Sequence, residues 1–221
     1  MARALAAEAL GTFALVFVGV GAIMVDADTG ALGHTGVAIA FGLVIMAMVY
    51  AVGHVSGAHL NPAVTLAFTL TRHFSGRHAA GYVAVQIGAA ICTALFLRGS
   101  LGDVGEVGRT SPADSVVQAF LWELVLSFLL MFVIMAVATD TRAVGEAAAL
   151  AIGGTVGVAA LVGGPVSGAS MNPARSIGPA VVSGEPRALW LYIAAPILGA
   201  ALGAVAYQVI RGQLQPPEWA E

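Results

Sequence analysis

Stretches that contain no Asp, Glu, Lys or Arg divide the chain at fairly regular intervals. A helix that crosses the hydrocarbon core of a bilayer needs about 20 apolar residues, and most of these stretches are near that length. Two of them, 29–71 and 147–174, are longer than one span requires, yet each leaves a remainder too short for a second span. The pattern therefore predicts six spanning segments, at about 5–25, 34–53, 79–98, 115–138, 147–163 and 188–210.

All six predicted spans should be α-helices, because an open sheet cannot satisfy its backbone hydrogen bonds in lipid. The alternative for the first one is a cleaved signal peptide, since Arg3 precedes an apolar core with small residues near Ala22. Glu8 within that segment and the lack of a clear cleavage site favour a retained span.

Composition supports an integral membrane protein and excludes several other classes. The 221-residue chain is 59% hydrophobic and 10% charged, whereas about a quarter of the residues of a soluble domain are charged. All nine basic residues are scattered Arg and the net charge is −3, which argues against a nucleic-acid partner. The single cysteine, Cys92, excludes an intrachain disulfide framework. The five His lack metal-ligand spacing, so we expect neither a metal nor a cofactor.

The Arg residues of the short loops predict the orientation of the spans. With the N-terminus inside, five Arg face the cytoplasm and three face outward, where six acidic residues also lie. The inner residues are Arg3, Arg72, Arg77, Arg142 and Arg211, and the outer ones are Arg98, Arg109 and Arg187. This bias predicts a multi-pass protein of the plasma or inner membrane with both termini in the cytoplasm.

The two halves of the chain repeat each other. The only two Asn residues each begin an Asn-Pro-Ala box, Asn61-Pro62-Ala63 and Asn172-Pro173-Ala174. The octapeptides SGAHLNPA at 56–63 and SGASMNPA at 167–174 are identical at six of eight positions and lie 111 residues apart. Two ordinary Asn-Pro turns would not share this context by chance. Such an internal repeat is typical of membrane transport proteins.

The number of spans in each half sets the direction of the two boxes. Each half has three spans, so the second half enters the membrane from the opposite side. The remainders that follow spans two and five then become re-entrant loops with short helices. About ten helical residues reach about 15 Å, half of the hydrocarbon thickness. Re-entrant backbone is tolerated only where protein buries it or it lines a watery cavity, so this geometry implies a pore or a solute site.

The chemistry of the boxes favours neutral solutes. Asn is a preferred N-cap and Pro suits the first helical position, so each box should begin a half-helix. The cap leaves the Asn amide group free as an uncharged donor, beside a helix N-terminus that carries roughly half a positive charge. Cations meet that field without a negative partner. A water that accepts from both amides breaks the chain along which a proton would hop.

These features resemble the aquaporin, or major intrinsic protein, family over about residues 5–210. They are the duplicated box, Glu8 and Glu123 in spans one and four, and six spans in about 220 residues. Within the family, ATDTRAVGE at 138–146 and GPVSGASMNPARSIGPA at 164–180 resemble plant nodulin-like intrinsic proteins and their bacterial relatives.

The resemblance implies an all-α membrane protein, with six transmembrane helices plus two re-entrant half-helices in an inverted 3+3 repeat. The whole chain, 1–221, would form one channel domain, with repeats at about 5–98 and 115–210. An outer loop at 98–114 would connect the repeats, and 212–221 is expected to be a disordered tail. The family also implies a homotetramer in the lipid bilayer.

The resemblance further implies a selectivity filter formed by Phe41, Ala160, Ala169 and Arg175. A charge such as Arg175 inside an apolar segment is a functional candidate, and the alternative is an Arg that snorkels to the interface. Ala160 stands where water-selective members carry His, so the filter should be wide enough for small polyols and for neutral arsenous or boric acid. Ser176 stands where glycerol-type members carry Asp, which leaves a mainly water-selective channel as the alternative.

Other roles follow from the same resemblance. The backbone carbonyls expected to line the pore belong to Gly57, Ala58, His59, Gly168, Ala169 and Ser170. Glu8 and Glu123 are expected to support the re-entrant loops, with a proton relay as the alternative. A coupled transporter needs ionisable groups near the midplane, where we expect only Asn side chains. The sequence shows no catalytic constellation, so a passive channel for small uncharged solutes is the leading hypothesis.

Overall fold

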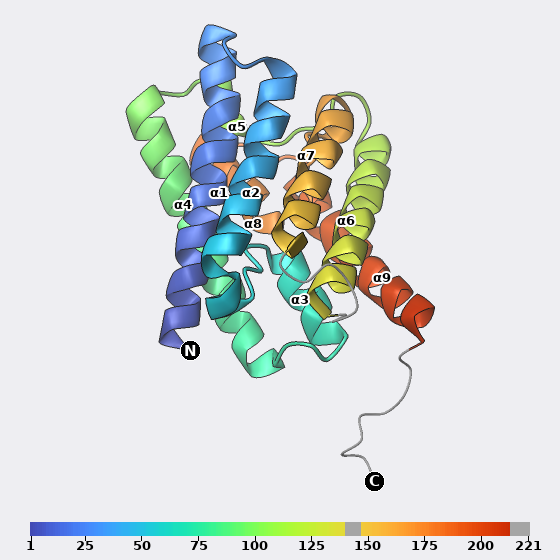
Figure 1. Ribbon diagram of the computed structural model, residues 1–221. Helices are drawn as coiled ribbons and strands as arrows, with labels where there is room; N and C mark the ends of the chain where they lie inside the picture. Colours follow the sequence, from blue (N-terminus) through green and yellow to red (C-terminus); the bar gives the residue numbers. More distant parts are fainter. Residues whose placement is uncertain (140–146, 213–221) are drawn as a thin grey trace.

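A computed structural model describes residues 1–139 and 147–212, and within these ranges all regular structure is helical (Figure 1). Every predicted span corresponds to a helix long and apolar enough to cross a membrane, with ends that differ by no more than four residues. These helices are α1 (Ala2–Thr29), α2 (Gly33–Ser56), α4 (Gly76–Leu101), α6 (Val116–Thr139), α7 (Ala148–Ser167) and α9 (Leu189–Arg211). The six-span prediction is therefore confirmed.

In each half, one short helix follows the second span. They are α3 (Pro62–Leu70), with 9 residues, and α8 (Pro173–Ser183), with 11 residues. At 1.5 Å per residue, each is about half as long as a bilayer is thick. Figure 1 shows both between the long helices, with α3 nearer the end at which α1 begins. The expected pair of half-helices in an inverted 3+3 repeat is thus present.

Glycines let the long helices approach at backbone distance. A Cβ added to Gly42 of α2 would lie 2.8 Å from the carbonyl oxygen of Gly153 on α7. Glycines 199 and 203 of α9 likewise face the backbone of α6. Small residues at such crossings stabilise helix pairs in lipid because they permit close van der Waals contact. Helices α2 and α7, the second span of each half, are thereby held directly against each other.

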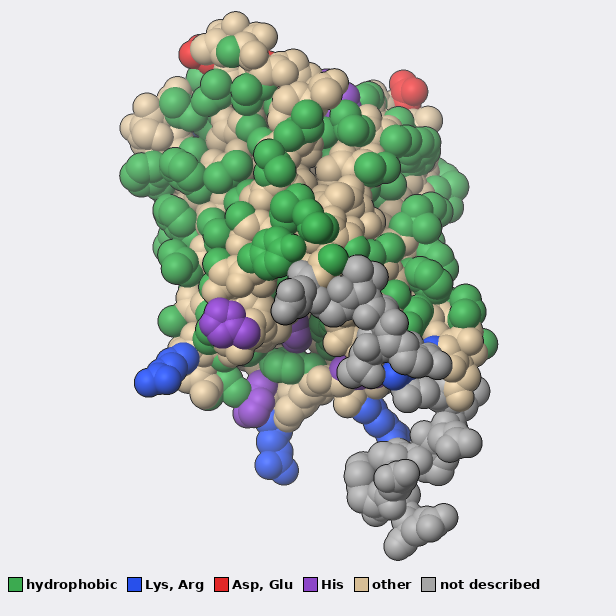
Figure 2. Space-filling view, viewed as in Figure 1, with side chains coloured by type: hydrophobic (Ala, Val, Ile, Leu, Met, Phe, Trp, Pro, Cys, Tyr) green, Lys and Arg blue, Asp and Glu red, His purple; other side chains and the backbone are tan. Residues whose placement is uncertain are grey.

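On the surface, charged side chains gather at the two ends of the bundle and are separated by an apolar band. The beginning of α1 and the end of α9 lie at the same end of the molecule (Figure 1). In Figure 2, Arg and His side chains surround that end, acidic side chains lie at the opposite end, and a band of hydrophobic side chains separates them. This distribution suits a protein that spans a bilayer. Arg142 and the expected tail beyond Gly212 lie outside the described residues.

The connection at 98–114 contains one short structured element. Helix α4 continues to Leu101, and the short element α5 (Gly105–Gly108) is a single left-handed turn. Its two non-glycine residues, Glu106 and Val107, have φ of 51° and 56°. Val107 is fully buried among residues of α1, α4 and α8. The apolar side chain anchors the turn in the core.

Candidate functional site

The two Asn-Pro-Ala boxes begin the half-helices as the sequence predicts. Asn61 is in an extended conformation, and its Oδ1 accepts a hydrogen bond of 2.8 Å from the Ala63 amide. Asn172 repeats this, with Oδ1 bonded to the Ala174 amide at 3.0 Å and to the Arg175 amide at 3.4 Å. Each Pro occupies the first helical turn, where its missing N–H costs nothing. Both Asn side chains are therefore held by their own helices.

The Asn amides also tie the two loops to each other. Asn61 Nδ2 donates to the carbonyl of Met171 at 2.7 Å, and Asn172 Nδ2 donates to the carbonyl of Leu60 at 2.8 Å. The sequence predicts that the amide group of each Asn is free. That prediction is wrong for one N–H group of each amide, which bonds the opposite loop. Because an amide has two such groups, one per Asn remains for a solute. These two reciprocal hydrogen bonds fix both amides at the junction of the half-helices.

A buried carboxylate supports each re-entrant loop. Glu8, on α1, accepts hydrogen bonds from the His59 and Leu60 amides and from the Ser56 hydroxyl, at 2.7 to 2.9 Å. Glu8 also accepts a bond of 2.8 Å from Gln86 Nε2 on α4. Backbone donors within a membrane need partners of this kind, because water cannot satisfy them there. These contacts are those expected of a loop-supporting residue.

Glu123, on α6, does the same for the second loop. It accepts hydrogen bonds from the Ser170 and Met171 amides and from the Ser167 hydroxyl, at 2.7 to 2.8 Å. Glu8 and Glu123 are both fully buried. The equivalent contacts show that the repeat in sequence is also a repeat in hydrogen bonding.

The loops hold matching left-handed residues before each box. In the first loop, Ala58 and Leu60 have φ of 45° and 50°, and in the second, Ala169 and Met171 have φ of 42° and 52°. Such a conformation costs a non-glycine residue about 1–2 kcal/mol. The Leu60 and Met171 amides donate to the buried carboxylates, and the Ala58 and Ala169 amides donate to serine hydroxyls, which offsets that strain. The carbonyls of Leu60 and Met171 consequently face the Asn of the other loop.

Two cavities follow one another through the bundle. The first, here called the inner cavity, has a volume of about 280 Å³, is lined by both Asn residues and reaches the end of α2 and the start of α7. The outer cavity, of about 260 Å³, opens beside Arg109, Thr110 and Ser111. All six residues expected to contribute pore carbonyls line one or other cavity, Gly168 the outer one and the rest the inner one. Together the cavities trace a path past both boxes.

The four residues expected to form the filter are the ones that line both cavities. They come from different elements: Phe41 from α2, Ala160 from α7, Ala169 from the second loop and Arg175 from α8. Arg175 is 2% exposed, and its Cζ lies 5.4 Å from the centroid of the Phe41 ring. Its Nη1 donates to the carbonyl of Gly108 at 3.1 Å. The snorkelling alternative does not fit this buried, bonded guanidinium.

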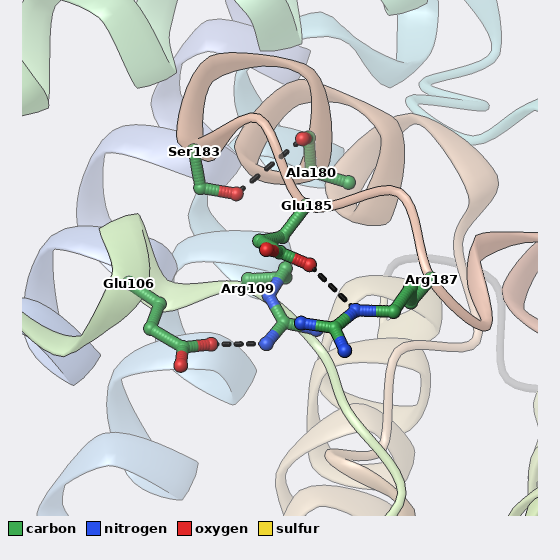
Figure 3. Close-up of polar contacts among 6 residues, drawn as sticks. All are labelled: Glu106, Arg109, Ala180, Ser183, Glu185 and Arg187. Atoms are coloured by element: carbon green, nitrogen blue, oxygen red, sulfur yellow. Dashed lines mark hydrogen bonds and ion pairs between the residues drawn. The ribbon is translucent and has the colours of Figure 1, made fainter.

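Four further charges lie in the connections between α4 and α6 and between α8 and α9 (Figure 3). Arg109 pairs with Glu106, and Arg187 Nε donates to Glu185 at 2.8 Å. The hydrogen bond and charge of Arg187, together with the charge of Arg109, lower the pKa of Glu185. Glu185 therefore stays ionised beside Arg187 at neutral pH. Arg109 also lines the outer cavity, so a second guanidinium lies near the path of a solute.

Several supporting residues escaped sequence reasoning. The Tyr82 and Tyr192 hydroxyls donate to the carbonyls of Ser56 and Ser167 at 2.9 and 2.7 Å. The repeat carries the signal for these pairs, since each Tyr follows its Asn by 20 or 21 residues. Gln86 gives no such signal, because it has no polar counterpart in the second half.

Comparison with known proteins gives one consistent result. The sequence profile described as Major intrinsic protein matches residues 1–207. Aquaporin NIP1-4 of Oryza sativa subsp. japonica is 54% identical over 208 residues, which cover 94% of this chain and 76% of that protein. Nodulin-26 of Glycine max is 46% identical over 209 residues, covering 94% of this chain and 77% of that protein. The aquaglyceroporin of Plasmodium falciparum superposes with a TM-score of 0.84 at 26% identity, covering 95% and 96% of the two chains.

Proposed function

Since this chain belongs to the major intrinsic protein family and is a membrane channel for small neutral solutes, we propose that it conducts glycerol-sized polyols as well as water. Membership of this family also means that the chain is not an enzyme. The observation that carries the proposal is the make-up of the filter. Its lining combines two methyl side chains, Ala160 and Ala169, with one guanidinium and one aromatic ring.

This make-up suits a solute with a carbon backbone and several hydroxyl groups. The hydroxyls can accept hydrogen bonds from Arg175 and from the remaining Asn amide hydrogens, while the carbon backbone passes Phe41. Neutral metalloid hydroxides, such as arsenous and boric acid, present similar hydroxyls on a compact centre. We therefore include them among the proposed solutes.

Cations and protons are excluded in this proposal by two positive features in series. Among the described residues that line the inner cavity, Arg175 alone carries a permanent charge. The N-termini of α3 and α8 add the positive ends of two helix dipoles at the boxes. A water that accepts from both Asn residues there has its oxygen fixed, which interrupts proton transfer.

The surroundings of the channel complete the proposal. Both termini lie in the cytoplasm, because the Arg-rich end of the bundle is the end at which α1 begins and α9 finishes. The membrane is the plasma or inner membrane. Four copies assemble, each with its own pore, through the hydrophobic side chains exposed on the outer helices.

Stopped-flow light scattering on proteoliposomes tests the proposal. Water and glycerol permeabilities are measured on one preparation, with empty liposomes as the control. Fast shrinkage followed by fast glycerol re-swelling is expected, with a flux that is linear in the gradient. Shrinkage without re-swelling would mean a mainly water-selective channel, and saturating, proton-dependent flux would mean a coupled carrier.

Ala160→His is expected to convert the filter towards water selectivity. Imidazole fills part of the opening beside Arg175 and adds a donor, so glycerol permeability should fall about tenfold or more while water permeability persists. Ala160→Ser, which adds a hydroxyl with little volume, serves as the matched control. The same stopped-flow assay gives both permeabilities. An unchanged ratio of water to glycerol permeability in Ala160→His would contradict the place of residue 160 in the filter.

A further inference from the structure

Helix α1 passes directly behind the aromatic wall of the filter. A Cβ added to Gly19 would lie 2.5 Å from Cδ1 and 2.6 Å from Cζ of the Phe41 ring. Side chains do not approach so closely, so the Phe41 ring occupies the space that a side chain at position 19 would need. Gly19 is buried, and Phe41 is partly exposed to the cavities. The missing side chain therefore lets the ring withdraw from the pore.

The other side of the ring bounds the solute path. Phe41 lines both cavities, and the Arg175 guanidinium lies over its face at 5.4 Å. A ring pushed away from α1 must consequently move into the opening that it shares with Arg175. We propose that Gly19 is a specificity-determining residue, because it sets how far Phe41 stands back from the filter. This inference rests on the proposed role of Phe41 in the filter.

Backbone geometry gives no reason for glycine at position 19. The residue lies in the middle of the 28-residue helix α1 and is absent from the positive-φ residues of the described chain. Glycine within a helix is less favourable than alanine by about 0.5–1 kcal/mol. Helix propensity would thus favour alanine, and the space taken by Phe41 is the feature that opposes it.

A second glycine of α1, Gly11, leaves space for the side chain of a loop residue in the same way. A Cβ at Gly11 would lie 3.1 Å from Cδ1 and 3.3 Å from Cγ of Leu60. Leu60 carries the carbonyl that accepts the Asn172 amide. Helix α1 therefore makes room for two residues of the solute path, although only its Leu15 lines the inner cavity among the residues described.

The test compares two glycine-to-alanine substitutions on α1. Gly19→Ala should move Phe41 into the filter, and the ratio of glycerol to water permeability should fall about tenfold, the effect of roughly one methyl group in a tight site. Gly21→Ala is the matched control, because its Cβ would meet Leu97 Cδ2 at an ordinary 3.4 Å. The control should keep the wild-type ratio. Both are assayed by stopped-flow light scattering.

A double variant separates crowding at the filter from general damage. Gly19→Ala combined with Phe41→Leu removes the ring that the new methyl group meets, so permeability should recover. If Gly19→Ala folds and leaves the permeability ratio unchanged, the inference is wrong. If it does not fold, recovery of folding in the double variant supports the steric coupling, and failure of both variants overturns it.

The outcome also distinguishes this inference from the proposed function. A wild-type channel that conducts water but no glycerol would refute the polyol proposal. Gly19→Ala would then still be expected to lower water permeability, with recovery in the double variant. Loss of that effect would refute the role of Gly19 by itself.

Discussion

Replacing Glu123 with alanine is expected to prevent assembly of a stable channel. The carboxylate accepts hydrogen bonds from the Ser170 and Met171 amides and from the Ser167 hydroxyl, all buried. Each buried donor left without a partner costs about 1–3 kcal/mol, so the two amides alone amount to about 2–6 kcal/mol. Since domains are stable by only about 5–15 kcal/mol, a loss of this size endangers the fold.

Thermal unfolding in detergent and water permeability per reconstituted protein measure this effect. Glu123→Gln keeps one carbonyl oxygen as an acceptor, so its stability should lie between those of the wild type and the alanine variant. Glu185→Ala is the matched control, because that carboxylate is on the surface and pairs with the exposed Arg187. A Glu123→Gln channel with wild-type stability and altered proton flux would instead favour the proton-relay alternative.

Much of the fold could be predicted because a membrane limits the alternatives. A helix that crosses lipid excludes charged residues over its length, so the charge-free stretches of the sequence indicate where each span lies. All six spans could therefore be located to within a few residues. The repeated boxes then predicted the half-helices, since Asn and Pro have defined places at a helix start. The supporting role of Glu8 and Glu123 also agrees with their contacts.

The remaining features depend on contacts between segments distant in sequence. The left-handed turn at Glu106 and Val107 is one case, because non-glycine residues adopt this conformation only where surrounding structure imposes it. Burial of Val107 and the bond from Gly108 to Arg175 supply that constraint. The bonds between each Asn and the opposite loop are another case. Neither Gly19 nor Phe41 alone indicates that the two share one space.

The filter was predicted by resemblance, and its role in selectivity stays a prediction. What the structure adds is a reason to test it: residues from four elements lie where the two cavities meet. The small side chains, Ala160 and Ala169, leave Arg175 as the dominant polar group there. The largest functional change should therefore come from that residue.

Arg175→Ala is expected to raise glycerol permeability and to open a path for cations. A guanidinium about 4 Å from a monovalent cation repels it by about 4 kcal/mol at an effective dielectric constant of 20. Its removal also empties the space beside Phe41, where the side chain now lies 5.4 Å from the ring. The helix N-termini at the boxes remain, so the rise in cation flux should be smaller than the full repulsion implies. An increase of about tenfold or more in proton or sodium leak is still expected.

Proteoliposomes loaded with a pH-sensitive dye measure the proton leak, and stopped-flow scattering on the same vesicles measures glycerol and water. Arg175→Lys preserves the charge but loses the planar group that lies over Phe41 and bonds Gly108. It should therefore keep ions out while its glycerol permeability changes. Persistent water flux in both variants shows that they are folded. Glycerol and proton permeabilities unchanged in Arg175→Ala would place the ion barrier at the Asn boxes alone.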